Sequence, residues 1–154
     1  MNEQSTELQG QLQGLGIWLG IVSELYTSRM NQLLSQHDFT IMQFGVLNHL
    51  ARNQGEKHTI SMITAAHEVN QPGATKIVKK LEGMGLLQTE RDQADSRKKY
   101  VSITEQGLEK LMQVQIELAP DVSAWFADWD AETRTTFLHH LQILGGWLDT
   151  NRLE

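Results

Sequence analysis

A long apolar segment near the N-terminus places the strongest constraint on how this chain can fold. Within residues 6–35, apolar side chains recur at spacings of four and three residues, at Leu8, Leu12, Leu15, Leu19, Val22 and Tyr26. This spacing predicts one long helix with an apolar stripe. Four further apolar residues widen the stripe, namely Ile17, Trp18, Ile21 and Leu25. A helix this apolar cannot cover itself, so we expect it to pack against a partner helix.

The composition is that of one ordinary globular domain. The chain has 154 residues, of which 40% are hydrophobic and 21% are charged. No apolar stretch approaches the roughly 20 residues that span a bilayer, and the N-terminal residues lack the pattern of a signal peptide. We therefore expect a cytoplasmic protein that does not associate with membranes.

Several kinds of chemistry are excluded by what the sequence lacks. It contains no cysteine, which excludes disulfides, thiolate metal sites and thiol redox sensing. The six histidines include no pair with convincing ligand spacing, so no metal site and no cofactor are expected. A glycine-rich phosphate loop and a nucleophile elbow are also missing, which argues against an enzyme.

The middle of the chain carries the start signals of three helices. Thr40 and Gln43 form a capping-box pair that begins a helix ending near residue 52. Thr59 is placed to cap a short helix that ends near residue 67, and Asn70 is placed to cap a helix over 71–84. Two short helices joined by a short turn predict a helix-turn-helix unit.

The remaining segments complete a winged arrangement. Strand-forming residues in "LLQTE" and "KYVSIT" flank the loop "RDQADSR", which predicts a two-stranded hairpin. Helical spacing returns from Thr104, and Pro120 is expected to kink or break that helix near Ala119. Asp130 is placed to cap a last helix, whose apolar stripe is Phe137, Leu141, Leu144 and Leu148.

This order predicts a mainly α fold with a small β-hairpin wing. Residues 40–103 form a winged helix-turn-helix core, and residues 6–35 and 104–150 form flanking helices. Together they make a single domain over residues 1–154.

The net charge of −6 is unevenly distributed along the chain. Residues 74–100 hold seven Lys or Arg against four acids, whereas residues 101–154 hold three against nine. A basic segment in an acidic body is typical of a localised nucleic-acid footprint. A plain charged surface would give the same balance.

The helix over 71–84 is predicted to read DNA with its outer face. Its inner face is apolar, at Ala74, Ile77, Val78 and Leu81. The candidate DNA contacts are Gln71, Pro72, Thr75, Lys76, Lys79 and Lys80. Gln71, Thr75 and Lys76 are placed for base edges, and the next two lysines for phosphates. The alternative is an amphipathic surface helix with solvated lysines.

The hairpin loop carries the second group of candidate DNA contacts. Asp95 lies two residues before Arg97, close enough to orient the guanidinium into a minor groove. Arg91 and Lys98 or Lys99 would then lie beside phosphates. The alternative is a solvated hairpin with a surface ion pair, which contributes only about 0–1 kcal/mol.

Residues 40–107 resemble the winged-helix core of MarR-type transcription regulators. The resemblance is carried by "TIMQFGVLNHL", "TKIVKKLEGMGLL" and "DSRKKYVSITEQG", in that order. The family's Asp-x-Arg wing pattern is matched by Asp95-Ser96-Arg97, and its following Thr-x-x-Gly ending by residues 104–107. At the position before Ile77 the family usually has Arg, where this chain has Lys76.

The resemblance implies a homodimer, built from the terminal helices, that binds double-stranded DNA. Each protomer would place helix 71–84 in a major groove and Arg97 in a flanking minor groove. The family typically represses transcription at near-palindromic sites and is often released by a small aromatic or phenolic effector. The absence of cysteine excludes its peroxide-sensing branch.

In such proteins the effector pocket usually lies between the dimerisation helices and the winged helix. The candidate lining residues here are Trp18, Tyr26, Met30, His37, Phe39 and Phe44. Ordinary core packing is the alternative for each of them. The alternative to DNA binding as a whole is a winged-helix interaction module that keeps the fold without the DNA contact.

Overall fold

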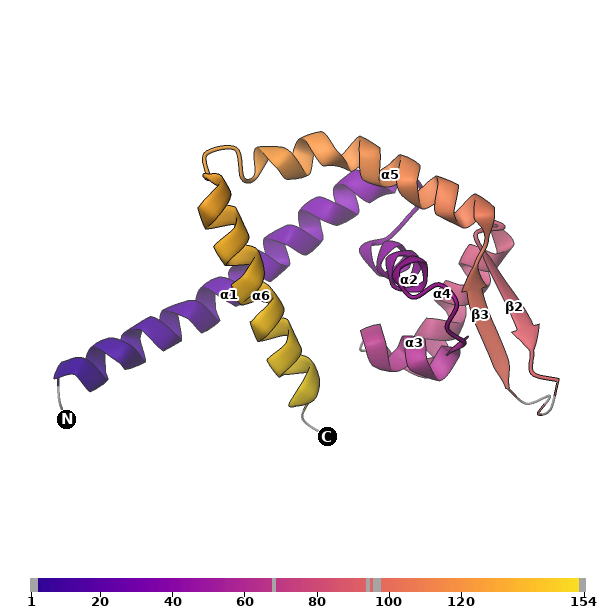
Figure 1. Ribbon diagram of the computed structural model, residues 1–154, viewed down its shortest axis with the longest axis horizontal. Helices are drawn as coiled ribbons and strands as arrows, with labels where there is room; N and C mark the ends of the chain where they lie inside the picture. The colour runs from indigo at the N-terminus through magenta and orange to yellow at the C-terminus, as the bar shows by residue number, and fades with distance from the viewer. Residues whose placement is uncertain (1–2, 68, 94, 96–97, 153–154) are drawn as a thin grey trace. The chain divides into compact units, whose positions relative to one another are not determined.

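The computed structural model describes residues 3–67, 69–93, 95 and 98–152, which contain six helices and three strands (Figure 1). The helices are α1 (Glu3–Ser35), α2 (Ile41–Arg52), α3 (Ile60–His67), α4 (Gln71–Gly83), α5 (Glu105–Ala124) and α6 (Ala131–Thr150). The strands are β1 (His58–Thr59), β2 (Leu87–Arg91) and β3 (Lys99–Ile103). The chain divides into two compact units, residues 1–115 and residues 116–154. The predicted mainly α winged helix-turn-helix is confirmed.

Side-chain caps fix the helix starts that the sequence predicted. The Gln43 backbone N–H donates to Thr40 Oγ1 at 3.2 Å, and the Thr40 N–H donates to Gln43 Oε1 at 3.0 Å. The side chains of Asn70 and Asp130 accept backbone N–H groups three residues on, at 2.8 Å and 2.7 Å. Each cap satisfies a donor that the helix itself leaves without a partner.

The sheet has three strands, so the predicted two-stranded hairpin was incomplete. Its order is β1-β3-β2, with both pairs antiparallel. The missed strand β1 has only two residues and pairs His58 with Val101. A strand that short has no alternation of apolar and polar residues, so the sequence carries no period-2 signal for it.

The core of the first unit is formed by side chains from α2, α3 and α4, from the sheet, from the end of α1 and from the start of α5. Its fully buried members are Leu34, Val46, Leu47, Leu50, Ile63, Ala74, Leu81, Val101 and Val114. From α1, only Met30 and Leu34 are among the buried hydrophobic residues. The core therefore holds α4 against α2, α3 and β2.

The junction between β3 and α5 is packed closely against the start of β2. Thr104 donates its backbone N–H to the Leu86 carbonyl at 3.0 Å and its hydroxyl to the Gly85 carbonyl at 2.7 Å. Gly107 donates its N–H to Thr104 Oγ1 at 3.0 Å and is itself buried. A Cβ atom at Gly107 would lie 2.2 Å from the Leu86 carbonyl oxygen, so only glycine fits here.

Pro120 does not break α5, so of the predicted kink or break the break does not occur, and the kink stays a prediction. The helix continues through it to Ala124. Proline removes the hydrogen bond to the carbonyl of Ile116, and both residues are exposed. Water can therefore hydrate the freed carbonyl, which lowers the cost of keeping the helix intact.

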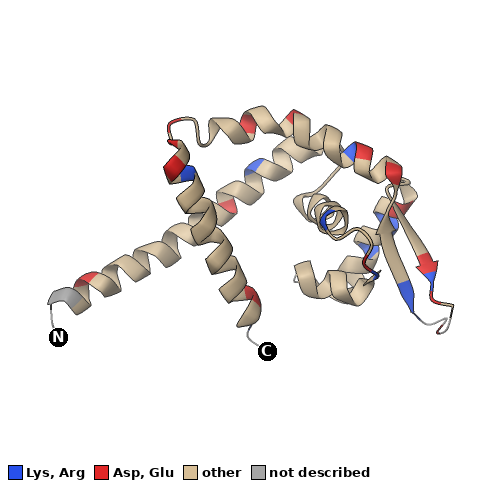
Figure 2. Ribbon diagram, viewed as in Figure 1, with Lys and Arg blue, Asp and Glu red and all other residues tan. Residues whose placement is uncertain are grey.

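Much of the apolar surface of α1 and α6 is exposed in the single chain. Charged residues are sparse along both helices (Figure 2). The exposed apolar residues of α1 are Leu8, Leu12, Leu15, Ile17, Trp18, Leu19, Ile21, Val22, Leu25 and Tyr26. Those of α6 are Phe137, Leu138, Leu141, Ile143, Leu144, Trp147 and Leu148. Among the described residues, none of the helices is long and apolar enough to cross a membrane.

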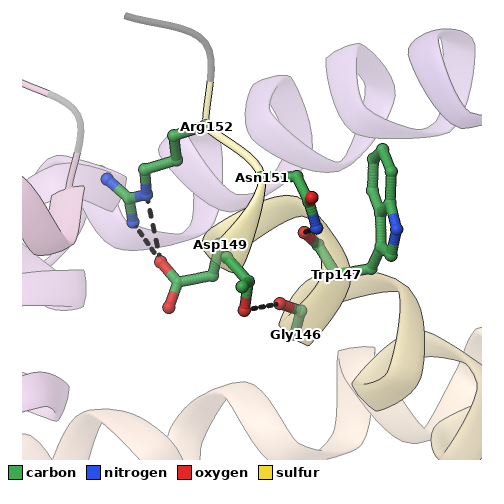
Figure 3. Close-up of polar contacts among 6 residues, drawn as sticks. Gly146, Trp147, Asp149, Asn151 and Arg152 are labelled. Atoms are coloured by element: carbon green, nitrogen blue, oxygen red, sulfur yellow. Dashed lines mark hydrogen bonds and ion pairs between the residues drawn. The ribbon is translucent and has the colours of Figure 1, made fainter.

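The C-terminal end of α6 is closed by local polar contacts (Figure 3). Asn151 donates both its backbone N–H, at 3.0 Å, and its side-chain amide, at 2.8 Å, to the Trp147 carbonyl. The Thr150 hydroxyl donates to the Gly146 carbonyl at 2.9 Å. Arg152 forms an ion pair with Asp149. The two Asn151 contacts satisfy the Trp147 carbonyl, to which the last helical turn itself supplies no donor.

Candidate nucleic-acid interface

Helix α4 buries one face and presents the other to solvent. Ala74, Val78 and Leu81 are buried, as the apolar spacing predicted, and Ile77 is half-buried. Gln71, Pro72, Lys76 and Lys79 are exposed. The fold therefore leaves the side of the helix predicted to read DNA open to a partner.

Five of the predicted DNA contacts lie around one shallow depression on α4. They are Gln71, Pro72, Thr75, Lys76 and Lys79. Thr75 is half-buried and donates its hydroxyl to the Gln71 carbonyl at 2.8 Å, which holds it along the helix. The depression thus combines an amide and two ammonium groups, which are suitable donors for base edges and phosphates, with a hydroxyl oxygen that can accept.

A second depression connects α4 to the base of the wing. It is lined by Thr59, Ile60, Ser61, Gln71, Lys98 and Lys99. The two wing lysines therefore lie beside the first residue of α4 and the start of α3. Thr59 and Ser61 were not among the contacts predicted from the sequence. Their hydroxyls at the start of a helix were the available signal, since such positions favour anions.

Hydrogen bonds order the described part of the wing loop. β2 and β3 are paired from Leu87 with Ile103 to Arg91 with Lys99. Beyond the strands, the Asp92 N–H donates to the Lys98 carbonyl at 3.0 Å, and the Lys98 N–H donates to the Asp95 carbonyl at 2.9 Å. Arg97 lies outside the described residues, so its pairing with Asp95 stays a prediction.

Acidic residues lie at the wing beside the basic ones. A hydrogen bond from the Tyr100 hydroxyl to Asp92 raises the pKa of that hydroxyl, and desolvation and the charges of Asp92 and Asp95 raise it further. The Lys57 ammonium lies 4.9 Å from the centre of the same ring. Asp92 and Asp95 help to fix the wing loop, and Lys98 and Lys99 lie at its base.

Lys80 differs from the other predicted contacts. Its ammonium donates to the backbone carbonyl of Asp38 at 3.1 Å and to Gln43 Oε1 at 3.4 Å. One acceptor lies in the corner between α1 and α2, and the other lies in the first turn of α2. The structure therefore directs this lysine toward the protein, whereas its neighbour Lys79 lines the depression on α4.

Three histidine rings pack together inside the helix-turn-helix unit. The ring of His49 lies edge-on to those of His58 and His67, with centroids 5.1 Å and 5.5 Å away. His58 is 3% exposed, and His58 Nδ1 and His67 Nε2 are buried without a hydrogen-bond partner. We call these residues the histidine cluster. Among the described residues, no group of three or more metal-binding side chains is arranged to hold an ion.

Burial makes protonation of two rings of the histidine cluster, His49 and His67, unfavourable. Desolvation lowers the pKa of His49 below the usual 6.5, and the charges of His58 and Arg52 lower it further against an opposing effect of Glu56. Desolvation likewise lowers the pKa of His67, followed by the charges of His49 and Arg52. The folded unit therefore favours the neutral rings of His49 and His67.

This arrangement predicts a loss of stability in mild acid. Because the folded-state pKa values are lowered, the unfolded chain binds more protons once the pH falls below about 6.5. The contribution of His49 and His67 to stability is fully present above that pH. It is lost as the pH decreases toward their folded-state pKa values. The melting temperature should therefore fall less steeply from pH 7 to 5.5 in His67→Leu than in the unmodified protein.

The matched control for this experiment is His139→Leu, at an exposed position on α6. It should keep the pH dependence of the unmodified protein. Equal slopes in all three proteins would show that the histidine cluster does not determine the acid sensitivity.

The six candidate effector residues do not share one environment. Met30 and Phe39 are each 3% exposed and belong to the core, whereas Trp18 and Tyr26 are 64% and 46% exposed on α1. His37 and Phe44 are half-buried. Their role in binding an effector stays a prediction.

Comparisons with known proteins agree with the geometry. Residues 28–114 match the family described as "Transcriptional regulator SarA/Rot". The HTH-type transcriptional repressor IacR of Pseudomonas putida is 33% identical over 98 residues, 64% of this chain. The matched region spans 58% of the length of that relative.

Solved structures of transcription regulators share the fold. A MarR-family regulator from Rhodococcus sp. RHA1 has a TM-score of 0.74 at 20% identity, covering 86% of this chain and 92% of that chain. Apo MarR from E. coli has a TM-score of 0.72 at 21% identity, covering 84% and 95%. The MepR–DNA complex from S. aureus has a TM-score of 0.71 at 20% identity, covering 86% and 97%.

Proposed function

Because this chain belongs to the SarA/Rot family of transcriptional regulators and is a MarR-type winged-helix protein, we propose that it is a dimeric, sequence-specific repressor that a small aromatic effector releases from DNA. As a transcriptional regulator it is not an enzyme. The observation that carries the DNA-binding proposal is the gathering of Gln71, Thr75, Lys76 and Lys79 around one exposed depression of α4.

The first turns of α4 enter the major groove in this proposal. Gln71 offers an amide that can pair with adenine N6 and N7, and Lys76 offers an ammonium for guanine O6 and N7. Thr75 lies between them on the same depression and supplies a hydroxyl or methyl contact. These three side chains read the bases and confer specificity.

The phosphate contacts come from both sides of the groove. Lys79 lies one turn beyond the base-reading residues, and Lys98 and Lys99 lie beside Gln71 at the base of the wing. With Arg91 at the paired end of β2, they fix the register of α4 on the duplex. Arg97 then extends into the flanking minor groove.

The proposed dimer is supported by the exposed apolar surface of α1 and α6. Monomeric soluble proteins rarely expose continuous apolar patches of this kind, and such patches mark interaction sites. Leu15 is 68% exposed and Trp147 is 61% exposed in the single chain, and a second copy would cover such side chains. Twofold symmetry would then present two copies of α4 to two half-sites.

Repression and effector release are supported by a relative and by the aromatic residues of α1 and its surroundings. IacR is a repressor by its name, and it supports repression as the mode of regulation here. The effector proposal rests on the aromatic and polar side chains between Trp18 and Phe44, of which Trp18 and Tyr26 are exposed. An aromatic effector would be ordered by contact with such rings.

A salt titration of DNA binding tests the proposal. We would measure fluorescence anisotropy with DNA from immediately upstream of the gene for this chain, and with a scrambled duplex. If Lys79, Arg91, Lys98 and Lys99 contact phosphates in both protomers, log affinity should fall with log salt at a slope of about −7. Saturation should require two chains per duplex.

A steep slope together with a preference for the upstream DNA would support a sequence-specific regulator. Weak, salt-independent binding to both duplexes would contradict the proposal and favour a winged-helix protein-interaction module.

A further inference from the structure

We propose that Lys80 is a positioning residue that ties the recognition helix to the corner between α1 and α2, and that it does not contact phosphate. The inference rests on the proposed DNA-binding function. Its basis is the pair of hydrogen bonds from the Lys80 ammonium to the Asp38 carbonyl and to Gln43 Oε1. We call these two contacts the Lys80 tether.

The corner that receives Lys80 has an unusual backbone conformation. Asp38 has a φ of 59°, and it is the one non-glycine residue with positive φ in the described part of the chain. The His37 and Phe39 N–H groups donate to the Leu34 carbonyl at 3.0 Å and 3.2 Å, which closes the end of α1. A residue other than glycine is disfavoured in this left-handed conformation. A hydrogen bond from Lys80 to the Asp38 carbonyl therefore helps to stabilise the corner.

The second acceptor links the tether to the start of α2. Gln43 is 7% exposed, and its Oε1 already accepts the Thr40 N–H of the capping box at 3.0 Å. Lys80 thus donates to both sides of the turn that joins the two helices. A buried amide oxygen with two donors has a fixed orientation, which makes it a suitable anchor.

Electrostatics favour a cation at this place. The last turn of α1 carries no basic residue of its own. The carbonyl end of a helix has a partial negative charge, which a nearby ammonium stabilises. Lys80, from a helix 42 residues away in sequence, supplies that charge.

Two adjacent lysines therefore have different tasks. Side chains of consecutive helical residues point about 100° apart. Lys79 lines the depression proposed to receive DNA, whereas Lys80 reaches the protein corner. Lys79 and Lys80 are suited to a paired experiment, because their side chains have the same chemistry and lie on the same helix.

The tether also has a consequence for the dimer. The exposed apolar surface of α1, proposed for dimerisation, and the recognition helix α4 are joined by Lys80 at the α1–α2 corner. A fixed angle between α1 and α4 sets the separation of the two recognition helices, which must match half-sites about one helical turn apart. Loss of the tether should weaken binding by loosening this geometry rather than by removing a charge contact.

The test compares Lys80→Met, Lys79→Met and Lys80→Arg in the full-length protein. Hydrogen exchange of the His37 and Phe39 amides is measured without DNA, and the salt dependence of binding is measured with the upstream duplex. Lys80→Met should speed exchange of those amides about fivefold and leave the salt slope unchanged. Lys79→Met should leave the exchange unchanged and reduce the slope by about two, one phosphate contact in each protomer.

Lys80→Arg should restore slow exchange, since a guanidinium can donate to the same carbonyl. Unchanged exchange in Lys80→Met, or a salt slope reduced as in Lys79→Met, would overturn the positioning role. If the unmodified protein showed no salt-dependent DNA binding, the proposed function would fail, and the exchange of the two amides would still decide whether the tether exists.

Discussion

Replacing Arg97 with alanine is expected to weaken binding to the upstream DNA roughly tenfold or more without changing the melting temperature. The wing begins where Arg91 pairs with Lys99, and Arg97 belongs to the loop between these strands. In the proposed complex its guanidinium occupies a narrow minor groove, where the negative potential is concentrated. Anisotropy titrations at one fixed salt concentration, with thermal melts of the same samples, measure both quantities.

Two further variants separate the possible causes. Arg97→Lys keeps the charge but loses the planar fork, so it should recover only part of the affinity. Arg152→Ala removes an exposed arginine at the end of α6, outside the proposed interface, and should leave DNA binding unchanged. An unchanged affinity in Arg97→Ala would remove the minor-groove role of the wing.

Gly107→Ala should be strongly destabilising. The new methyl group would lie 2.2 Å from the Leu86 carbonyl oxygen and 2.8 Å from Ile103 Cγ1, and neither distance is tolerated. Leu86 and Thr104 are joined by a backbone hydrogen bond of 3.0 Å, so the neighbouring backbone cannot move away freely. We expect a loss of about 3 kcal/mol or more, which corresponds to a melting temperature lower by about 6–12 °C.

Gly14→Ala is the matched control within a helix. No atom would lie within 4 Å of the added Cβ. Alanine is a better helix former than glycine by about 1 kcal/mol, so this variant should melt at the same temperature or higher. A Gly107→Ala protein as stable as the unmodified one would show that the β3–α5 junction can relax.

The parts of the fold that were predictable have local signals. The capping box of Thr40 and Gln43, the cap of Asn70 and the strand-forming stretches around the wing each depend on neighbouring residues. The outer face of α4 follows from its helical spacing, and this is why five predicted contacts lie around one depression. Such features are determined within one or two helical turns of sequence.

The features that the sequence could not predict depend on contacts between distant segments. Strand β1 exists because His58 pairs with Val101, 43 residues later. The Lys80 tether and the histidine cluster likewise join residues from different elements. The break that was one of the outcomes expected at Pro120 is absent for another reason. The local effect of this proline is unfavourable, but solvent exposure lowers the cost.

The central position of β3 determines how the protein can respond to its surroundings. The strand leads out of the wing, pairs with β2 on one side and with the residues before α3 on the other. Any tilt of the wing must therefore carry the start of the helix-turn-helix with it. We expect the winged helix-turn-helix to move as one rigid body. In the proposed dimer, a conformational change that begins in α1 would then alter the separation of the two winged helix-turn-helix units and would not bend the wing.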